Sequence, residues 1–299
     1  MRISHLNQLF GIKYLAFSLI FLLASTIFAL SFSEISGKLS ISRICFITSF
    51  GICAFFCARS LGIIINQVID INFDKKNPRT SSRVLPMQLV SIRFAKITAL
   101  ASSVLFLVFG CLLSTSCGII AAISIFVMFV YPYTKRYSYV SHWILGLVYY
   151  LAIIMNFSAL STEQLSFRLF LVASLWGITS ALIIAANDII YAIDDINFDV
   201  QEGLYSIPAR FGKNIAITVA TVSLSLSLIS YLSIGWLACL GIPFYLSSIF
   251  PIFSIFSTIH KYHSVRKEDA YSCFFWSNIR IALSFLSSMI IIAASNYFF

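Results

Sequence analysis

Residues 44–74 read ICFITSFGICAFFCARSLGIIINQVIDINFD, and this stretch decides the fold. Its first part, 44–65, is an almost entirely apolar run, as long as the roughly 20 residues that span a bilayer as a helix. Asn66, Asp70 and Asp74 follow at spacings of four residues, which places them one turn above each other on a helix. The stretch therefore predicts a transmembrane helix with a stripe of oxygen-bearing side chains at one end.

The rest of the chain shares this apolar character. Of its 299 residues, 60% are hydrophobic and only 10% are charged, with a mean hydropathy of +0.94. A soluble domain is about 25% charged, so this chain has too few charges to cover a surface that faces water. Only 12 Gly and 6 Pro are present, which excludes collagen-like and disordered proteins. We predict an all-α polytopic membrane protein.

Apolar runs separated by charged or turn-forming segments predict nine transmembrane helices. The predicted spans are 14–33, 44–65, 96–114, 117–134, 142–160, 168–190, 214–235, 237–258 and 276–298. The first span follows basic residues as a signal peptide would, but it is long and lacks a clear small-residue cleavage site, so we interpret it as a retained helix. Separate soluble segments are absent from the sequence, and we treat 1–299 as a single membrane domain.

Basic residues divide unequally between the two sides that nine spans create. Fifteen lie on the side of the N-terminus: Arg2, Lys13, Lys75, Lys76, Arg79, Arg83, Arg93, Lys96, Lys135, Arg136, Arg210, Lys213, Lys261, Arg266 and Lys267. The other side holds three, Lys38, Arg43 and Arg168. Cytoplasmic loops carry the excess of Lys and Arg, so the N-terminus is predicted to be cytoplasmic and Phe299 to lie outside. The net charge of +9 then reports orientation rather than nucleic-acid binding.

Acidic residues are concentrated in two short segments. Seven of the eleven Asp and Glu are Asp70, Asp74, Asp188, Asp194, Asp195, Asp199 and Glu202. The pentapeptide DINFD occurs at 70–74 and again at 195–199, which suggests an internal repeat with two half-sites that face each other. Asp188, Asp195 and Asp199 are predicted to form a second stripe with Tyr191 beside it, whereas Asp194 is expected to point away.

These acids predict a cation site. Each carboxylate at this depth costs about 2.5–3.5 kcal/mol, and neighbouring carboxylates repel one another unless a cation lies between them. Oxygen ligands without His or Cys suit Mg²⁺. Solvated helix caps are the simpler alternative, but two copies with matched spacing make them less suitable as an explanation.

Basic side chains accompany both acidic segments. They are Arg79 and Arg83 after the first, Arg210 and Lys213 after the second, and Lys135 at the end of the fourth span, four residues after Tyr131. Acids that hold Mg²⁺, ringed by Arg and Lys, describe a diphosphate site. No phosphate-binding G-x-x-x-x-G-K-[ST] loop is present in the sequence, so a nucleotide is not indicated. Tyr131 also fits an interfacial anchor.

Arg59 lies inside the second span, deeper in the membrane than the acids. It precedes Asn66 by seven residues and so shares nearly the same helix face. A buried arginine needs an anionic partner, which is either a substrate carboxylate or an Asp from another helix. The histidines His5, His142, His260 and His263 share no spacing, and we interpret them as interface residues rather than catalysts.

Three motifs in this order resemble the UbiA superfamily of intramembrane aromatic prenyltransferases. The first is NQVIDINFD at 66–74, followed by NPRT at 77–80 and RVLP at 83–86. The second comprises DIIY at 188–191, DINFD at 195–199 and GLYSIPARFG at 203–212, and YPYTK at 131–135 matches a Y-x-x-x-K element. Val84 stands where the family often has proline, a minor departure.

The resemblance implies nine helices around a central cavity in the inner (plasma) membrane, and the distribution of basic residues predicts that the active site faces the cytoplasm. It implies transfer of a polyprenyl group from polyprenyl diphosphate to 4-hydroxybenzoate or, as the alternative, to a dihydroxynaphthoate. Mg²⁺ would be held by Asn66, Asp70, Asp74, Asp195 and Asp199. The substrates would be bound by Arg59, Asn66, Arg79, Arg83, Lys135, Tyr191, Arg210 and Lys213.

In the mechanism that the resemblance implies, the allylic C–O bond ionises and the ring carbon activated by the hydroxyl attacks the carbocation. Catalytic roles would fall to Tyr131, Asp188 and Asp195, with Asp188 or Asp195 taking the proton, and Arg59 would hold the carboxylate of the acceptor. A secondary transporter is the rival of another class, and it predicts acids near the bilayer midplane. A non-catalytic protein that binds isoprenoid lipids is a third alternative.

Overall fold

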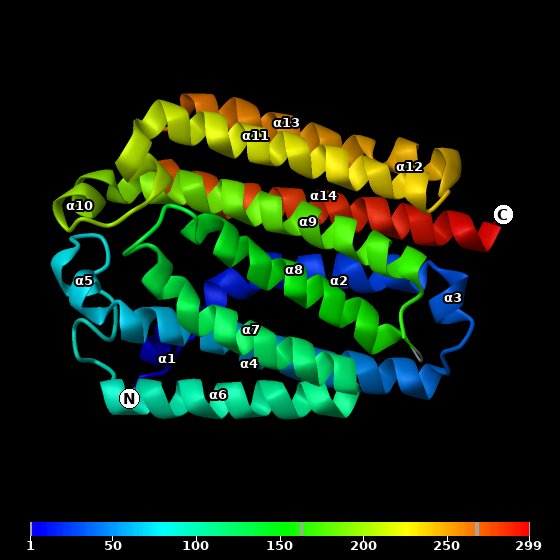
Figure 1. Cartoon of the computed structure of the whole chain (residues 1–299), viewed down its shortest axis with the longest axis horizontal. Coiled ribbons are helices and arrows are strands. Elements are labelled where there is room, and N and C mark those ends of the chain that lie inside the picture. Colours follow the sequence, from blue (N-terminus) through cyan, green and yellow to red (C-terminus); the bar gives the residue numbers. More distant parts are fainter. Residues whose placement is uncertain (1, 162–163, 267–268, 299) are drawn as a thin grey trace.

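The computed structural model describes residues 2–161, 164–266 and 269–298, and in these residues every regular element is a helix (Figure 1). Lys267 and Phe299, which entered the topology prediction, lie outside the described residues. The long helices are α2 (Leu15–Leu30), α4 (Ile41–Ile69), α6 (Ile92–Leu113), α7 (Thr115–Thr134), α8 (Ser141–Leu160), α9 (Phe167–Tyr191), α11 (Ile207–Leu237), α13 (Ile249–Ser264) and α14 (Ala270–Phe298). The short elements are α1 (Ile3–Leu9), η1 (Ile12–Tyr14), α3 (Ser33–Ser36), α5 (Ile71–Lys76), η2 (Ala192–Asp195), α10 (Ile196–Gln201) and α12 (Gly241–Ser247).

The predicted nine spans are confirmed: the described residues contain nine helical segments long and apolar enough to cross a membrane. They lie side by side along one axis of the molecule (Figure 1). The eighth is made of α12 and α13, and it begins at Gly241 instead of 237. Pro251 explains the break within it, because a proline has no N–H to donate to Ser247, where α12 ends.

Serine side chains begin five of the helices. The residue before the first helical turn is Ser40, Ser91, Ser114, Ser166 or Ser206, and its hydroxyl accepts the backbone N–H three residues later. Such a cap satisfies one of the four N–H groups that a helix start leaves without an internal partner. Each of these five helices therefore begins directly after a serine that caps its first turn.

Helices α8 and α9 approach each other closely because glycines lie between them. A Cβ atom on Gly146 would stand 2.6 Å from the carbonyl oxygen of Ala181, and one on Gly177 would stand 2.6 Å from the Tyr150 ring. Small residues of this kind let helix backbones pack in a membrane, where burial of apolar surface provides little driving force. Helix α11 packs on the other side of α9.

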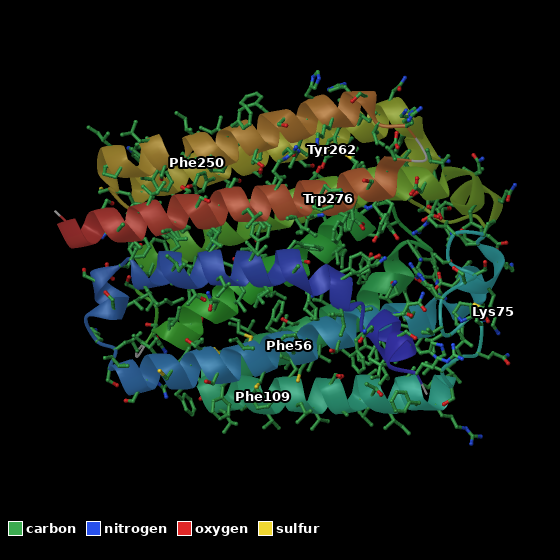
Figure 2. All side chains as sticks on the ribbon, turned by 180° about the vertical axis from the view of Figure 1, so that it is seen from behind. Phe56, Lys75, Phe109, Phe250, Tyr262 and Trp276 are labelled. Carbon is green, nitrogen blue, oxygen red and sulfur yellow. The ribbon has the colours of Figure 1, made fainter. Side chains whose placement is uncertain are left out.

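An aromatic cluster fills the space between α9, α2, α11 and α14. Trp176 on α9 is completely buried, and its ring centroid lies 6.1 Å from Phe28, 5.9 Å from Tyr231 and 5.0 Å from Phe285. Pairs with such geometry contribute about 0.5–1.5 kcal/mol each. Large apolar side chains such as Phe56, Phe250 and Trp276 are exposed along the outer faces (Figure 2), as expected for a surface that contacts lipid.

The two DINFD segments lie at the same end of the bundle, where α5 and α10 leave the long helices (Figure 1). Neither segment simply continues its helix, because Asp70 (φ −92°, ψ 5°) and Asp195 (φ −97°, ψ 3°) depart from helical angles. In the first motif the backbone bonds from Asp70 N to Asn66 O and from Asp74 N to Asp70 O preserve the stacking of the predicted stripe. In the second, Asp188 lies on α9 and Asp195 in the 3₁₀ turn η2, so the predicted second stripe does not lie on one continuous α-helix.

Candidate functional site

A cavity of about 1140 Å³ lies between α2, α4, α7, α8, α9 and α14, as predicted for the centre of the bundle. One face of α4 lines it continuously: Ile47, Gly51, Ala54, Ala58, Gly62 and Asn66. From Ile47 to Gln67 this face extends about 30 Å at 1.5 Å per residue. The cavity therefore runs along most of the bundle and joins the end that carries the acidic motifs to an apolar interior.

Six predicted site residues line the motif end of this cavity: Asn66, Arg79, Arg83, Tyr131, Asp188 and Tyr191. Asp194 lines it too, although we expected this residue to point away. Its side chain is brought inward by η2, a turn that the heptad-like spacing of the second motif did not indicate. The acids lie at one end of the bundle rather than at its middle, unlike the arrangement that a secondary transporter predicts (Figure 1).

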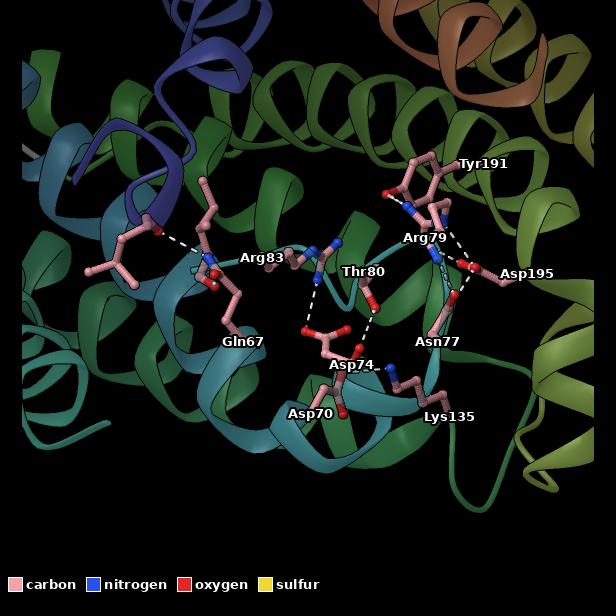
Figure 3. Close-up of polar contacts among 12 residues, drawn as sticks. Gln67, Asp70, Asp74, Asn77, Arg79, Thr80, Arg83, Lys135, Tyr191 and Asp195 are labelled. Atoms are coloured by element: carbon pink, nitrogen blue, oxygen red, sulfur yellow. Dashed lines mark hydrogen bonds and ion pairs between the residues drawn. The ribbon is translucent and has the colours of Figure 1, made fainter. Parts of the chain in front are cut away.

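The first motif pairs its acids with bases from two elements. Asp70, 1% exposed, accepts an ion pair from Lys135 (Nζ to Oδ2, 2.6 Å), and Arg136 Nη2 lies 3.5 Å from Oδ1. Asp74 accepts from Arg83 Nη1 at 3.0 Å (Figure 3). Burial raises the pKa of the Asp70 carboxyl and the ammonium of Lys135 lowers it, with burial the larger effect.

The second motif depends on residues of the first. Arg79 donates two hydrogen bonds to Asp195, one of them from Nε to Oδ1 at 2.9 Å, and Asn77 Nδ2 donates to the same Oδ1 at 2.9 Å (Figure 3). Asp199 accepts from the Ser206 hydroxyl at 2.8 Å. The two half-sites therefore meet, and the connection is made by the loop that follows α5.

Arg79 has a second partner in Tyr191. The guanidinium donates to the Tyr191 hydroxyl and its Cζ lies 4.6 Å from the centre of the ring. Burial by itself would lower the pKa of Arg79, but Tyr191 and Asp195 raise it by more. The side chain therefore stays charged at the edge of the cavity.

The oxygen donors of the two motifs fit Mg²⁺. The group consists of carboxylates and one amide, without imidazole or thiolate, which is the donor chemistry that Mg²⁺ prefers. Within the described ranges, no three His, Cys, Asp or Glu side chains converge into a closed metal site. Mg²⁺ is commonly held by one or two carboxylates together with phosphate oxygens and water, so the two acid pairs would suit it without forming a closed site of their own.

Three predicted substrate-binding residues do not line the cavity: Lys135, which pairs with Asp70, and the two bases Arg210 and Lys213. Arg210 is exposed and Lys213 half-buried, both on α11, and neither belongs to the residues that line the cavity. Gly212, with φ 82° and ψ 167°, interrupts the helix between them. The bases that do lie at the motif end come from the α5–α6 loop and from the end of α7.

Arg59 lines the cavity inside the membrane-spanning part of α4. Its Nη1 donates to the Tyr149 hydroxyl (3.3 Å) and its Nη2 to the carbonyl oxygen of Tyr14 (3.4 Å). Its Nε is buried without a hydrogen-bond partner, and no acidic side chain of the described residues pairs with it. Of the two partners considered for Arg59, an Asp from another helix is therefore not observed, and an anion bound in the cavity suits the guanidinium.

His142 is a site residue that the sequence analysis missed. We interpreted it as an interface residue, but it is 3% exposed and its Nδ1 lies 2.8 Å from Asp188 Oδ2. Its partner lies 46 positions away on another helix, so no spacing along the chain could have indicated the contact. Asn77 could have been found, since it belongs to the quoted NPRT segment.

Comparison with known proteins gives one family. The model of the UbiA prenyltransferase family matches residues 18–279. A 4-hydroxybenzoate octaprenyltransferase of Blochmanniella pennsylvanica is 29% identical over 226 residues, 74% of either chain. Relatives of the same name from Francisella tularensis match at about 30% identity over about half of their own length.

Solved structures share the fold. The apo structure of a UbiA homolog from Aeropyrum pernix has a TM-score of 0.78 at 23% identity, covering 97% of this chain and 98% of that one. A UbiA homolog from Archaeoglobus fulgidus, bound to DMAPP and Mg²⁺, has a TM-score of 0.64 at 16% identity over 96% and 98% of the chains. Both likenesses concern the arrangement of the helices.

Proposed function

Because the chain belongs to the UbiA prenyltransferase family, and is therefore a transferase of prenyl groups, we propose that it joins a polyprenyl group to 4-hydroxybenzoate. The observation that carries the acceptor is Arg59, whose guanidinium faces the cavity without an acidic partner and with its Nε unsatisfied. The carboxylate of a small aromatic acid would provide that partner. The relatives named 4-hydroxybenzoate octaprenyltransferase support this acceptor, and a dihydroxynaphthoate carries the same carboxylate.

The motif end of the cavity would bind the diphosphate of polyprenyl diphosphate. Arg79 and Arg83 line that end, so two cations face the leaving group, while Lys135 pairs with the proposed Mg²⁺ ligand Asp70. Mg²⁺ would be held by Asn66, Asp70, Asp74, Asp195 and Asp199, and it would supply neutralisation of charge on the phosphate oxygens. The Archaeoglobus fulgidus homolog bound to DMAPP and Mg²⁺ supports this assignment.

Aromatic side chains would shelter the allylic cation. The residues that line the cavity near the motif end include Tyr14, Phe17, Tyr131, Tyr191, Tyr271 and Phe274. Their ring faces attract a positive charge, and their bulk excludes water that would otherwise capture the cation. We assign Tyr131 a catalytic role on this wall, close to the leaving group.

The acceptor ring would lie between Arg59 and the motif end. Seven residues of α4 separate Arg59 from Asn66, or about 10 Å, which a benzoate-sized ring and the first prenyl carbon could span. Asp188 lines this part of the cavity, whereas Asp195 does not line it and is proposed as a Mg²⁺ ligand. We therefore assign proton removal from the ring to Asp188.

The decisive experiment supplies membranes that contain this protein with polyprenyl diphosphate, Mg²⁺ and one acceptor at a time. The acceptors are 4-hydroxybenzoate, a dihydroxynaphthoate and the decarboxylated analogue of each, and products are identified by mass spectrometry. We expect prenylation of a carboxylated acceptor and at least about tenfold less of its analogue. Equal prenylation of both would remove Arg59 from the acceptor site, and movement of substrate across liposomes without any product would favour a transporter.

We also propose that the site faces the cytoplasm of the plasma membrane. Arg168 pairs with Glu34 at 3.6 Å and Arg43 reaches the Leu113 carbonyl, which places bases of the less basic side at the end opposite α5 and α10. Cysteines introduced near 77 and 204, in a variant without exposed native cysteines, should resist labelling from outside. Labelling of both positions from outside would overturn the orientation.

A further inference from the structure

His142 connects two elements of the site from a buried position at the start of α8. Its Nδ1 lies 2.8 Å from Asp188 Oδ2 on α9, and its Nε2 accepts the backbone N–H of Ile207 at 3.4 Å, in the first turn of α11. The side chain does not line the cavity, although its partner Asp188 does. His142 therefore contacts the proposed base Asp188 without lining the cavity itself.

The backbone contact determines which nitrogen of the ring carries the proton. A backbone N–H is always a donor, so the Nε2 that it approaches must be the unprotonated nitrogen. In the neutral ring the proton then lies on Nδ1 and is donated to Asp188. The N–H of Ile207 is one of the donors that a helix start leaves without an internal partner, so the contact also caps the start of α11.

We propose that His142 is the positioning residue of the base Asp188: it holds Oδ2 and so directs Oδ1 towards the acceptor ring. The proposal rests on the proposed function and assigns a part in its last step. The prenyl C1–O bond has already broken, and the new C–C bond joins C1 to the ring carbon. The C–H bond of that carbon then breaks, its electron pair returns to the aromatic ring, and the proton goes to Asp188 Oδ1.

Two amide substitutions separate this role from simple helix capping. The side-chain nitrogen of H142N lies where Nδ1 was and can still donate to Asp188, whereas the amide of H142Q reaches the place of Nε2 and can accept only from Ile207. If the bond to Asp188 matters, H142Q loses about 10- to 100-fold in kcat, part of the 10²–10⁴ that a positioned base provides, and H142N loses less than about fivefold. The KM for polyprenyl diphosphate should be unchanged in both.

An isotope effect identifies the step. With an acceptor deuterated at the ring carbon that reacts, proton removal should limit H142Q and produce a kinetic isotope effect larger than that of the wild type and of H142N. The matched control is H263Q on the exposed His263 of α13, which should behave like the wild type.

Each result decides the matter. An active wild type with equal kcat in H142N and H142Q, or with the larger loss in H142N, would overturn the inference and leave the proposed function standing. Loss of donor binding in both variants would make His142 a structural residue and overturn it as well. A wild type that prenylates none of the carboxylated acceptors would overturn the proposed function and the inference with it.

Discussion

The two DINFD segments have the same sequence and nearly the same backbone, yet their aspartates have different surroundings. Asp70 and Asp195 each precede a six-residue helix, with φ and ψ that differ by only a few degrees. Asp70 contacts two bases from the end of α7, and Asp74 contacts one from its own loop. Asp195 contacts Arg79 from the loop of the first motif. One pentapeptide thus occupies two unlike half-sites.

The difference shows that the first motif and α7 supply the positive charge for both half-sites. The bases that follow the second motif, Arg210 and Lys213, lie away from the cavity. The second motif contributes carboxylates and the Ser206 hydroxyl. Arg79 and Asn77 position its Asp195 carboxylate. A change in the first motif should therefore affect both halves, and a change in the second should stay local.

Loss of either leading aspartate tests this comparison most severely. D70N and D195N should each reduce prenyl transfer to background, because each removes a proposed Mg²⁺ ligand. D70N should also be less stable by about 1–3 kcal/mol, since Lys135 and Arg136, which are 32% and 28% exposed, lose their buried partner. Product formation and the Tm in detergent measure the two effects.

E202Q, which breaks the exposed Lys76–Glu202 pair between the motifs, is the control, and it should change product formation and the Tm by little. Full turnover by D70N or D195N, or turnover in excess chelator, would contradict the site.

The helices that lead into the two motifs differ in charge at the same sequence distance from Asp70 and Asp195. Arg59 stands eleven residues before Asp70, and Ile184 stands eleven residues before Asp195, and both line the cavity. R59A should lower kcat/KM for the acceptor by about 30- to 700-fold, which corresponds to about 2–4 kcal/mol for a buried charge pair, with little change in donor affinity. Steady-state kinetics with each substrate varied measure the split. R280Q replaces another arginine within a span, one that contacts Thr258 and does not line the cavity, and should keep kcat/KM near that of the wild type.

The connection between the half-sites is the next test. R79K keeps the charge but loses the two-pronged contact with Asp195, so donor binding should weaken by about 10- to 100-fold. R83K loses a single bond to Asp74 that a lysine can replace, and it should weaken donor binding less than about fivefold. Titration of polyprenyl diphosphate against both variants measures the difference. Equal effects would mean that Arg79 does not join the motifs.

The smallest expected effect concerns the apolar end of the cavity. Gly51 precedes Asp70 by nineteen residues and lines the cavity, and a Cβ atom on it would meet nothing within 4 Å. The corresponding residue before Asp195 is Trp176, which is fully buried in the aromatic cluster. G51L should therefore protrude into the space for the donor tail and lower the preference for long over short donors by about 5- to 30-fold.

The control for Gly51 lies at the same height on the opposite face of α4. Cys53 is exposed and does not line the cavity, so C53L adds the same bulk towards lipid and should leave the preference for donor length unchanged. Competition between a long and a short polyprenyl diphosphate measures the preference. An unchanged preference in G51L would place the tail elsewhere.

The amino-acid sequence by itself determined the nine spans and the position of the acidic motifs along them. An apolar run of about 20 residues has one stable way to satisfy its backbone in lipid, which is a helix, and this choice needs no other part of the chain. Arg59 could also be recognised from the sequence, because a charged side chain inside a membrane span is costly without a partner. Neighbours on one helix, such as Asn66 and Asp70, follow from spacing alone.

Only the tertiary structure decided which charges meet. The contacts from Arg79 to Asp195 and from His142 to Asp188 join residues 116 and 46 positions apart, and they depend on how separate helices are placed side by side. Spacing along the chain carries no information about such pairs, which is why Arg210 and Lys213 were predicted at the site and His142 was missed. The identical DINFD segments make the reason plain: the local backbone follows the pentapeptide, whereas the partners of its aspartates follow the packing of the bundle.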